Sequence, residues 1–262
     1  MALTNKLSAI GDAIREKTGK TELLTLDAMP LEIASITTGG GEGIEVEPMV
    51  LTGNCQYACS GAMESNYIDM FGDTVSTDKI QSGQYMFYFN ENKKIPFDLN
   101  FDADYYTRHR LNNMFYSASK LEELPKMNNV KVENIESIFT SCSSLKEIPM
   151  DYFDNWDWSY VKNATGAYSC YCQSIYQGCY NLRYAPNFTQ TMINRAVSNY
   201  YCIYYYGYSN CYSIEDIKLP VYDLATWTSN AFQNTIYQTY SLRHLTFNTN
   251  ENGSPIVCGA LK

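Results

Sequence analysis

A short motif of hydrophobic and small residues recurs along the chain between residues 86 and 247. An aromatic residue is followed, at intervals of three, by a small residue or Cys, by Leu or Ile, and by an aliphatic residue that usually precedes Pro. The best copies begin at Phe115, Phe139, Tyr176 and Tyr208, and weaker copies cover 86–96 and 236–245. The chain therefore contains a structural repeat.

A motif that recurs every 24 to 37 residues predicts a solenoid, in which each coil buries its apolar face against its neighbours. The uneven spacing favours loops inserted between coils over a smooth horseshoe. A short strand or turn is expected at the aliphatic position, because the following proline limits further pairing. The residues expected to face the core are Phe115, Leu121, Leu124, Phe139, Cys142, Leu145, Ile148, Cys179, Leu182, Cys211, Ile214 and Ile217.

Three of the nine cysteines, Cys142, Cys179 and Cys211, occupy the motif position that Ala118 holds in another copy. Alanine and a free thiol are both small and are both often buried, so a column of small residues inside the coils is predicted. Metal binding is the alternative, and it needs His or Cys partners at short spacing.

Other cysteines give weaker signals. Cys170 and Cys172 are closely spaced but have no His nearby. Cys55 and Cys59 could pair in a disulfide or lie in an N-terminal cap of the solenoid, which we place at about 47–85. A full disulfide framework is not expected in a chain made in reducing cytoplasm.

The first 38 residues have a different pattern. Leu3, Leu7, Ile10 and Ile14 recur at helical spacing, and Pro30 fits the first turn of a second short helix. Such short helices need a partner surface, so residues 1–38 are predicted to be a helical docking or oligomerisation segment. An ordinary hairpin packed on the main domain is the alternative. The glycine-rich residues 39–46 read as a flexible linker to a solenoid over 47–262.

Two resemblances to known families accompany these patterns. The segment LSAIGDAIREKTGKTELLTLDAMPLEIASI resembles a segment of tail and minor structural proteins of phages that infect Gram-positive gut bacteria. The motif over 86–247 resembles leucine-rich repeats of the BspA type, which bacterial surface proteins and phage structural proteins share. The expected fold class is therefore α+β: a short N-terminal helical hairpin, a glycine linker and an irregular BspA-like leucine-rich-repeat β-solenoid.

Composition and charge limit the partners. The net charge of −9 argues against nucleic acid, because phosphate binding needs a basic surface. No run of apolar residues is long enough for a transmembrane helix, and the N-terminus lacks the apolar core of a secretory signal. We therefore expect no membrane insertion, and release by another route such as host lysis.

No catalytic motif is recognisable, so the protein is not expected to be an enzyme or to need a cofactor. Asp151, Asp154 and Asp157 could suggest a glycosidase pair or a calcium loop. However, Phe and Trp stand where a calcium loop would have ligands and glycine. A surface loop with two half-buried tryptophans, Trp156 and Trp158, is the preferred interpretation.

Tyrosine is concentrated between residues 160 and 212, which hold 13 of the 24 tyrosines and no acidic residue. Tyrosine with Ser, Asn and Gly is typical of binding surfaces, and aromatic faces also stack on sugar rings. Tyrosines that only stabilise the stack are the alternative. The candidate binding residues are Tyr168, Tyr171, Tyr180, Tyr184, Tyr201, Tyr205, Trp156 and Trp158.

These patterns and resemblances lead to an expected function in a phage virion. The favoured hypothesis is a tail fibre or tail-tip protein that is expected to form a homo-oligomer and whose residues 1–38 contact other virion proteins. Its tyrosine-rich solenoid face would bind a host cell-surface glycan or protein. The alternative is a purely structural virion component, such as a baseplate or capsid-decorating protein, that binds other virion subunits.

Overall fold

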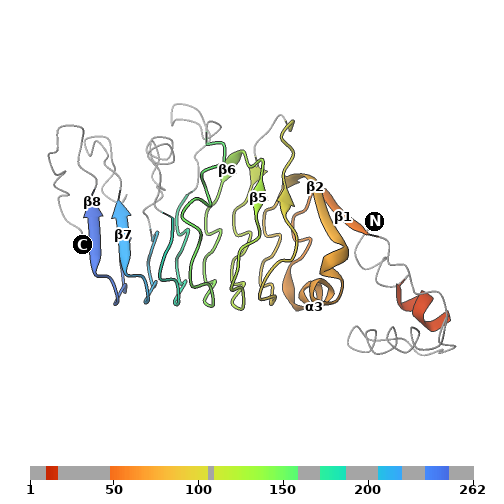
Figure 1. Ribbon diagram of the computed structural model, residues 1–262, viewed down its shortest axis with the longest axis horizontal. Helices are drawn as coiled ribbons and strands as arrows, with labels where there is room; N and C mark the ends of the chain where they lie inside the picture. The colour runs from red at the N-terminus through yellow and green to blue at the C-terminus, as the bar shows by residue number, and fades with distance from the viewer. Residues whose placement is uncertain are drawn as a thin grey trace.

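The repeat folds into a β-solenoid of stacked coils. The computed structural model describes residues 10–16, 48–105, 109–158, 172–186, 206–219 and 234–247. Its successive coils stand side by side along the long axis of the molecule, from β1 and α3 at one end to β8 at the other (Figure 1). The described residues are mostly β with few helices. The sequence prediction of a stacked repeat is confirmed at this level.

All the described strand pairs are parallel, as expected for equivalent segments of successive coils. One sheet has the order β1-β2-β4-β6, and two smaller sheets pair β3 with β5 and β7 with β8. The bounds are β1 Met49–Asn54, β2 Val75–Ser82, β3 Leu99–Asn100, β4 His109–Arg110, β5 Met127–Asn128, β6 Val132–Asn134, β7 Asp216–Leu219 and β8 His244–Phe247.

Each coil contains a turn centred on the aromatic residue of the motif. The backbone N–H of Phe115 donates to the carbonyl of Ile138 in the next coil at 2.9 Å, and that of Phe139 donates to Ile175 at 3.2 Å. The residues two before and two after the aromatic residue make the same kind of bond, for example Asn113 to Glu136 at 2.9 Å. These bonds fix which residues of successive coils are equivalent.

The two flanking residues of each turn have positive φ. Those two before the aromatic position are Tyr57, Tyr85, Asn113, Ser137, Ser174, Tyr206 and Asn234. Those two after it are Gly61, Phe89, Ser117, Ser141, Gly178, Asn210 and Gln238. The left-handed region is costly for residues with a Cβ, and Gly and Asn relieve that cost. The turn shape is thus constant although few of these positions are glycine.

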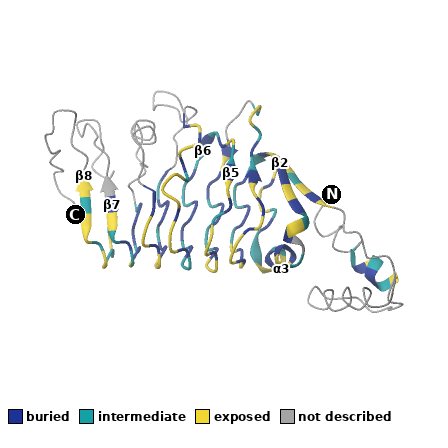
Figure 2. Cartoon of the chain, viewed as in Figure 1, coloured by how far each residue is buried: buried dark blue, intermediate teal, exposed yellow. Residues whose placement is uncertain are grey.

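The aromatic residues form a stacked column inside the coils. The ring centroids of Phe87 and Phe115 lie 5.2 Å apart, and the rings of Phe139 and Tyr176 are 6.2 Å apart with an interplanar angle of 3°. Every predicted core residue is buried except Leu124, which is half-buried and packs against the core. Ile217 in β7 pairs directly with Leu245 in β8, so the aliphatic position of the motif lies in a strand there. Figure 2 shows buried residues along the coils throughout the stack, with exposed residues at the turns and also along β1 and β8.

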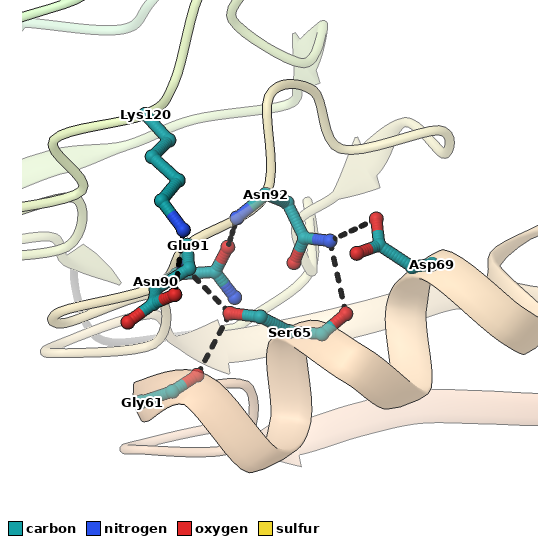
Figure 3. A network of polar contacts seen from close by, with 7 residues as sticks. All are labelled: Gly61, Ser65, Asp69, Asn90, Glu91, Asn92 and Lys120. Atoms are coloured by element: carbon teal, nitrogen blue, oxygen red, sulfur yellow. Dashed lines mark hydrogen bonds and ion pairs between the residues drawn. The ribbon is translucent and has the colours of Figure 1, made fainter. Parts of the chain in front are cut away.

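A helix that the repeat pattern did not reveal lies at the N-terminal end of the stack. Helix α3, Gly61–Phe71, is followed by a 3-10 helix, Gly72–Thr74. Ser65 of α3 accepts a hydrogen bond from the backbone N–H of Glu91 at 2.6 Å. Asn92 donates to the Ser65 carbonyl at 2.9 Å and to Asp69 at 2.6 Å (Figure 3). These bonds fasten the helix to the adjacent coil, within the region predicted as a cap.

Part of the N-terminal segment is also described. Residues 10–16 are helical, inside the first predicted helix, and Ile14 is buried. The predicted second helix and the glycine linker at 39–46 lie outside the described residues. The hairpin as a whole therefore stays a prediction.

Candidate functional site

Three exposed tyrosines from consecutive turns form a stack on the surface of the solenoid. Tyr180, Tyr212 and Tyr240 each lie four residues after the aromatic position of their coil. The centroids of Tyr180 and Tyr212 are 4.9 Å apart with an interplanar angle of 10°, and those of Tyr212 and Tyr240 are 5.3 Å apart. We call these three residues the C-terminal tyrosine ladder.

The ladder is accessible, since the exposed fractions of Tyr180, Tyr212 and Tyr240 are 43%, 37% and 73%. Tyr212 has a ring stacked on each of its faces, so the edge of its ring is what it offers to solvent. The ladder therefore presents a row of ring edges with polar ends, together with the outer face of Tyr240. Such a row can bind a partner through edge contacts and hydrogen bonds.

Charged residues flank the ladder in the same coils. Arg183 forms an ion pair with Glu215 at 2.6 Å, and its guanidinium lies 5.6 Å from the ring centroid of Tyr184. Glu215 raises the pKa of Arg183 through a side-chain hydrogen bond. Tyr184 is 43% exposed. Because Arg183 is already paired, this end of the solenoid has no strong attraction for an anionic ligand through that residue.

A second group of aromatic side chains lies on turns near the N-terminal end. Tyr57 and Tyr85 stack with centroids 4.8 Å apart, and Tyr88 and Tyr116 stack at 5.3 Å. Phe89 contacts Tyr88 edge to face at 4.4 Å. We call these five residues the N-terminal aromatic patch. The sequence analysis did not identify this patch, because its residues belong to three coils and come together only when those coils stack.

The predicted binding residues are distributed as follows. Tyr180 and Tyr184 are exposed in neighbouring positions of one coil. Tyr168, Tyr171, Tyr201 and Tyr205 lie outside the described residues. Tyr212 and Tyr240, which complete the ladder, were not among the candidates. The recurrence of Tyr four residues after the aromatic position would have revealed them.

The prediction that Trp156 and Trp158 are half-buried residues of a binding surface is wrong, because each is only 5% exposed. The backbone N–H of Asp157 donates to the carbonyl of Val130 at 2.7 Å, and that of Val132 donates to Asp157 at 3.0 Å. This segment thus pairs with the neighbouring coil like a strand. Side chains alternate between the two faces of a strand, so both indoles point inward while Asp157 stays outside.

The cysteine column is buried and structural in character. The thiols of Cys142, Cys179 and Cys211 donate to the carbonyls of Phe115, Phe139 and Tyr176 at 3.1, 3.0 and 2.9 Å. Asn90 holds the equivalent position near the cap and donates to the carbonyl of Cys59 at 2.8 Å. The column therefore supplies a small donor to the preceding coil, which explains cysteine where alanine would also fit.

Thiol chemistry is suppressed at these positions. Burial raises the pKa of Cys179 to about 12 and that of Cys142 well above its ordinary value. Cys55 and Cys59 are free and buried, within the region predicted as a cap. Within the described residues, no group of three or more His, Cys, Asp or Glu side chains could hold a metal ion. Nor does any helix in that part of the chain have the length and apolarity to cross a membrane.

Comparisons with protein-family models, with curated proteins and with solved structures gave no match.

Proposed function

We propose that the protein is a structural component of a phage virion that binds the host cell surface through the exposed aromatic turns of its solenoid. Residues 1–38 would attach it to other virion proteins, as the resemblance of that segment to phage tail proteins implies. The solenoid would then act as a stiff spacer that displays the C-terminal tyrosine ladder. No catalytic step or cofactor is part of this proposal.

The observation that carries the proposal is the exposure of three stacked tyrosines in consecutive coils. Burial of their edges would release water from aromatic surface, and their hydroxyl groups would add hydrogen bonds. A stacked ring is also held in place before binding, so less conformational entropy is lost when a partner arrives. Rigid aromatic side chains of this kind are enriched at binding surfaces.

The proposal is tested by adding the labelled full chain to intact Gram-positive gut bacteria and measuring retained label. A triple variant, Tyr180→Ser with Tyr212→Ser and Tyr240→Ser, should lose at least about tenfold in affinity, since each anchor contributes on the order of 1 kcal/mol. The matched control is Tyr237→Ser, which removes a tyrosine that is 53% exposed from the turn that also holds Tyr240.

Equal loss in the control and the triple variant would assign the effect to general surface change rather than to the ladder. If the unmodified chain binds no tested cells and antibody labelling places it inside the particle, host binding is refuted. A purely structural role in the virion would then be the better account.

A further inference from the structure

Phe89 combines exposure with an unfavourable backbone conformation. Its side chain is 51% exposed and its φ is +54°. The equivalent position in the other described coils holds Gly61, Ser117, Ser141, Gly178, Asn210 or Gln238. Phe89 is thus the one bulky hydrophobic residue at this position in the described coils, and it is directed to solvent rather than into the core.

On the other side of the turn, Tyr57 shows the same combination, and the half-buried Tyr85 shares the positive φ. Their φ angles are +59° and +55°, and Tyr57 is 49% exposed. Polar residues, Asn113 and Ser137, take this position in the next two coils. The left-handed region is unfavourable for each of these bulky residues. Stability alone therefore favours smaller residues at these places, and strained positions of this kind often mark binding sites.

The rings of the patch are arranged so that some of their faces stay open. Tyr85 and Tyr88 meet at an interplanar angle of 80°, and Tyr88 and Phe89 meet at 85°. Rings at right angles cannot cover one another completely, in contrast to the parallel rings of the tyrosine ladder. The patch therefore offers flat apolar faces in two orientations, with phenol hydroxyl groups beside them.

The charges close to the patch are an ion pair and an acid. Glu91 and Lys120 form an ion pair at 2.8 Å, and a carboxylate oxygen of Glu64 lies 3.9 Å from the position of a Cβ on Gly61, in the turn that also holds Tyr57. Partial burial, and the neighbouring phenols of Tyr116, Tyr85 and Tyr57, raise the pKa of Tyr88. Its hydroxyl group is therefore an uncharged donor at neutral pH. Gln56, Gln84 and Asn113 in the same turns add amide groups.

We propose that the N-terminal aromatic patch is a binding site for a neutral saccharide chain, with Phe89 as its main stacking platform. A sugar ring has a flat face of C–H groups that packs on an aromatic face, and hydroxyl groups at its edge that pair with phenols and amides. An acidic glycan or peptide would gain little from Lys120, because this cation is already paired with Glu91. The site is distinct from the tyrosine ladder and does not depend on the function proposed for it.

The test is to apply the full chain to an array of neutral and acidic oligosaccharides, with a polyproline peptide as a further probe. The variant Phe89→Gly should bind the neutral oligosaccharides about tenfold more weakly, because it loses the stacking face. The same variant should unfold at about the same temperature as the unmodified chain, because relief of the positive φ offsets the lost ring contacts to Tyr88 and Tyr116 and the greater freedom of glycine in the unfolded chain. Ser141→Gly is the matched control: it changes the same position of another coil and should leave saccharide binding unchanged.

Loss of saccharide binding with unchanged stability would support the proposal, since a residue that only holds the fold together cannot give that combination. Lowered stability of Phe89→Gly would overturn it, as would neutral oligosaccharides that bind both forms equally. Binding confined to acidic oligosaccharides or to polyproline, or no binding at all, would also refute it. None of these outcomes decides whether the tyrosine ladder binds host cells, which the triple tyrosine variant tests separately.

Discussion

Replacing the glycine in one of the repeated left-handed turns should have the opposite effect on stability from the one usually seen when glycine is replaced by alanine. Gly178 has φ +73°, and a Cβ added there would lie 3.2 Å from the Ser141 side-chain oxygen in the preceding coil. Replacing glycine by alanine normally stabilises a protein by about 0.4–1 kcal/mol, through the unfolded state. The left-handed conformation costs a residue with a Cβ about 1–2 kcal/mol. Gly178→Ala should therefore destabilise the chain by about 1 kcal/mol, with the close contact to Ser141 adding to this.

A double-mutant cycle separates the two causes. Ser141→Gly removes the contact, so Gly178→Ala in that background should show the backbone cost alone. Stability is measured by urea unfolding, followed by fluorescence of the buried Trp156 and Trp158. A loss of about 1 kcal/mol corresponds to a fall of roughly 2–4 °C in Tm for a chain of this size. An increase in stability for Gly178→Ala in both backgrounds would refute the proposed turn geometry.

Three further predictions concern the core. Leu145→Ala should cost about 2–5 kcal/mol in urea unfolding because Leu145 is fully buried, whereas Ser143→Ala in the same motif should have little effect; equal losses would contradict the register. Burial lowers the pKa of His109 from 6.5 to about 4, so the folded chain stays neutral there while the unfolded chain takes up a proton. The free energy of unfolding should therefore fall as the pH is lowered from 6.5 to 4. The fall should be larger in the unmodified chain than in His109→Gln by on the order of 2 kcal/mol, which urea unfolding of both proteins at a series of pH values would measure. Cys142 and Cys179 should resist alkylation at pH 8 until urea is added, as judged by mass spectrometry of their peptides, and native-state labelling of Cys142 would disprove its burial.

The sequence predicted the stacking unit well because the core obeys a simple rule. The motif places aromatic, small and aliphatic residues at intervals of three. They can all be buried only when equivalent residues of neighbouring coils stack on one another. The structure places Phe139, Cys142, Leu145 and Ile148 in the core in the same register. These intervals lie within a single coil, so they can be recognised in one sequence without an alignment.

The surface could not be read in the same way. Trp156 and Trp158 were predicted to be half-buried in a surface loop and to belong to the binding surface, but pairing of this segment with Val130 and Val132 turns both indoles inward. The aromatic patch depends on which turns become neighbours, which follows from the register between coils rather than from any one segment. Helix α3 was missed because nothing in the repeat requires a helix at that end.

The uneven repeat spacing becomes understandable once the turn is seen as the unit that sets the register. Phe139 and Tyr176 are 37 residues apart in sequence, yet their rings lie almost parallel in the stack. Phe115 and Phe139 are 24 residues apart and stack in the same column. Hydrogen bonds between the turns fix the position of each coil, and a longer connection adds only a small entropic cost, which grows with the logarithm of its length. The solenoid can therefore accept insertions between its coils, and residues on the surface can change while the buried column of Phe, Tyr and Cys is kept.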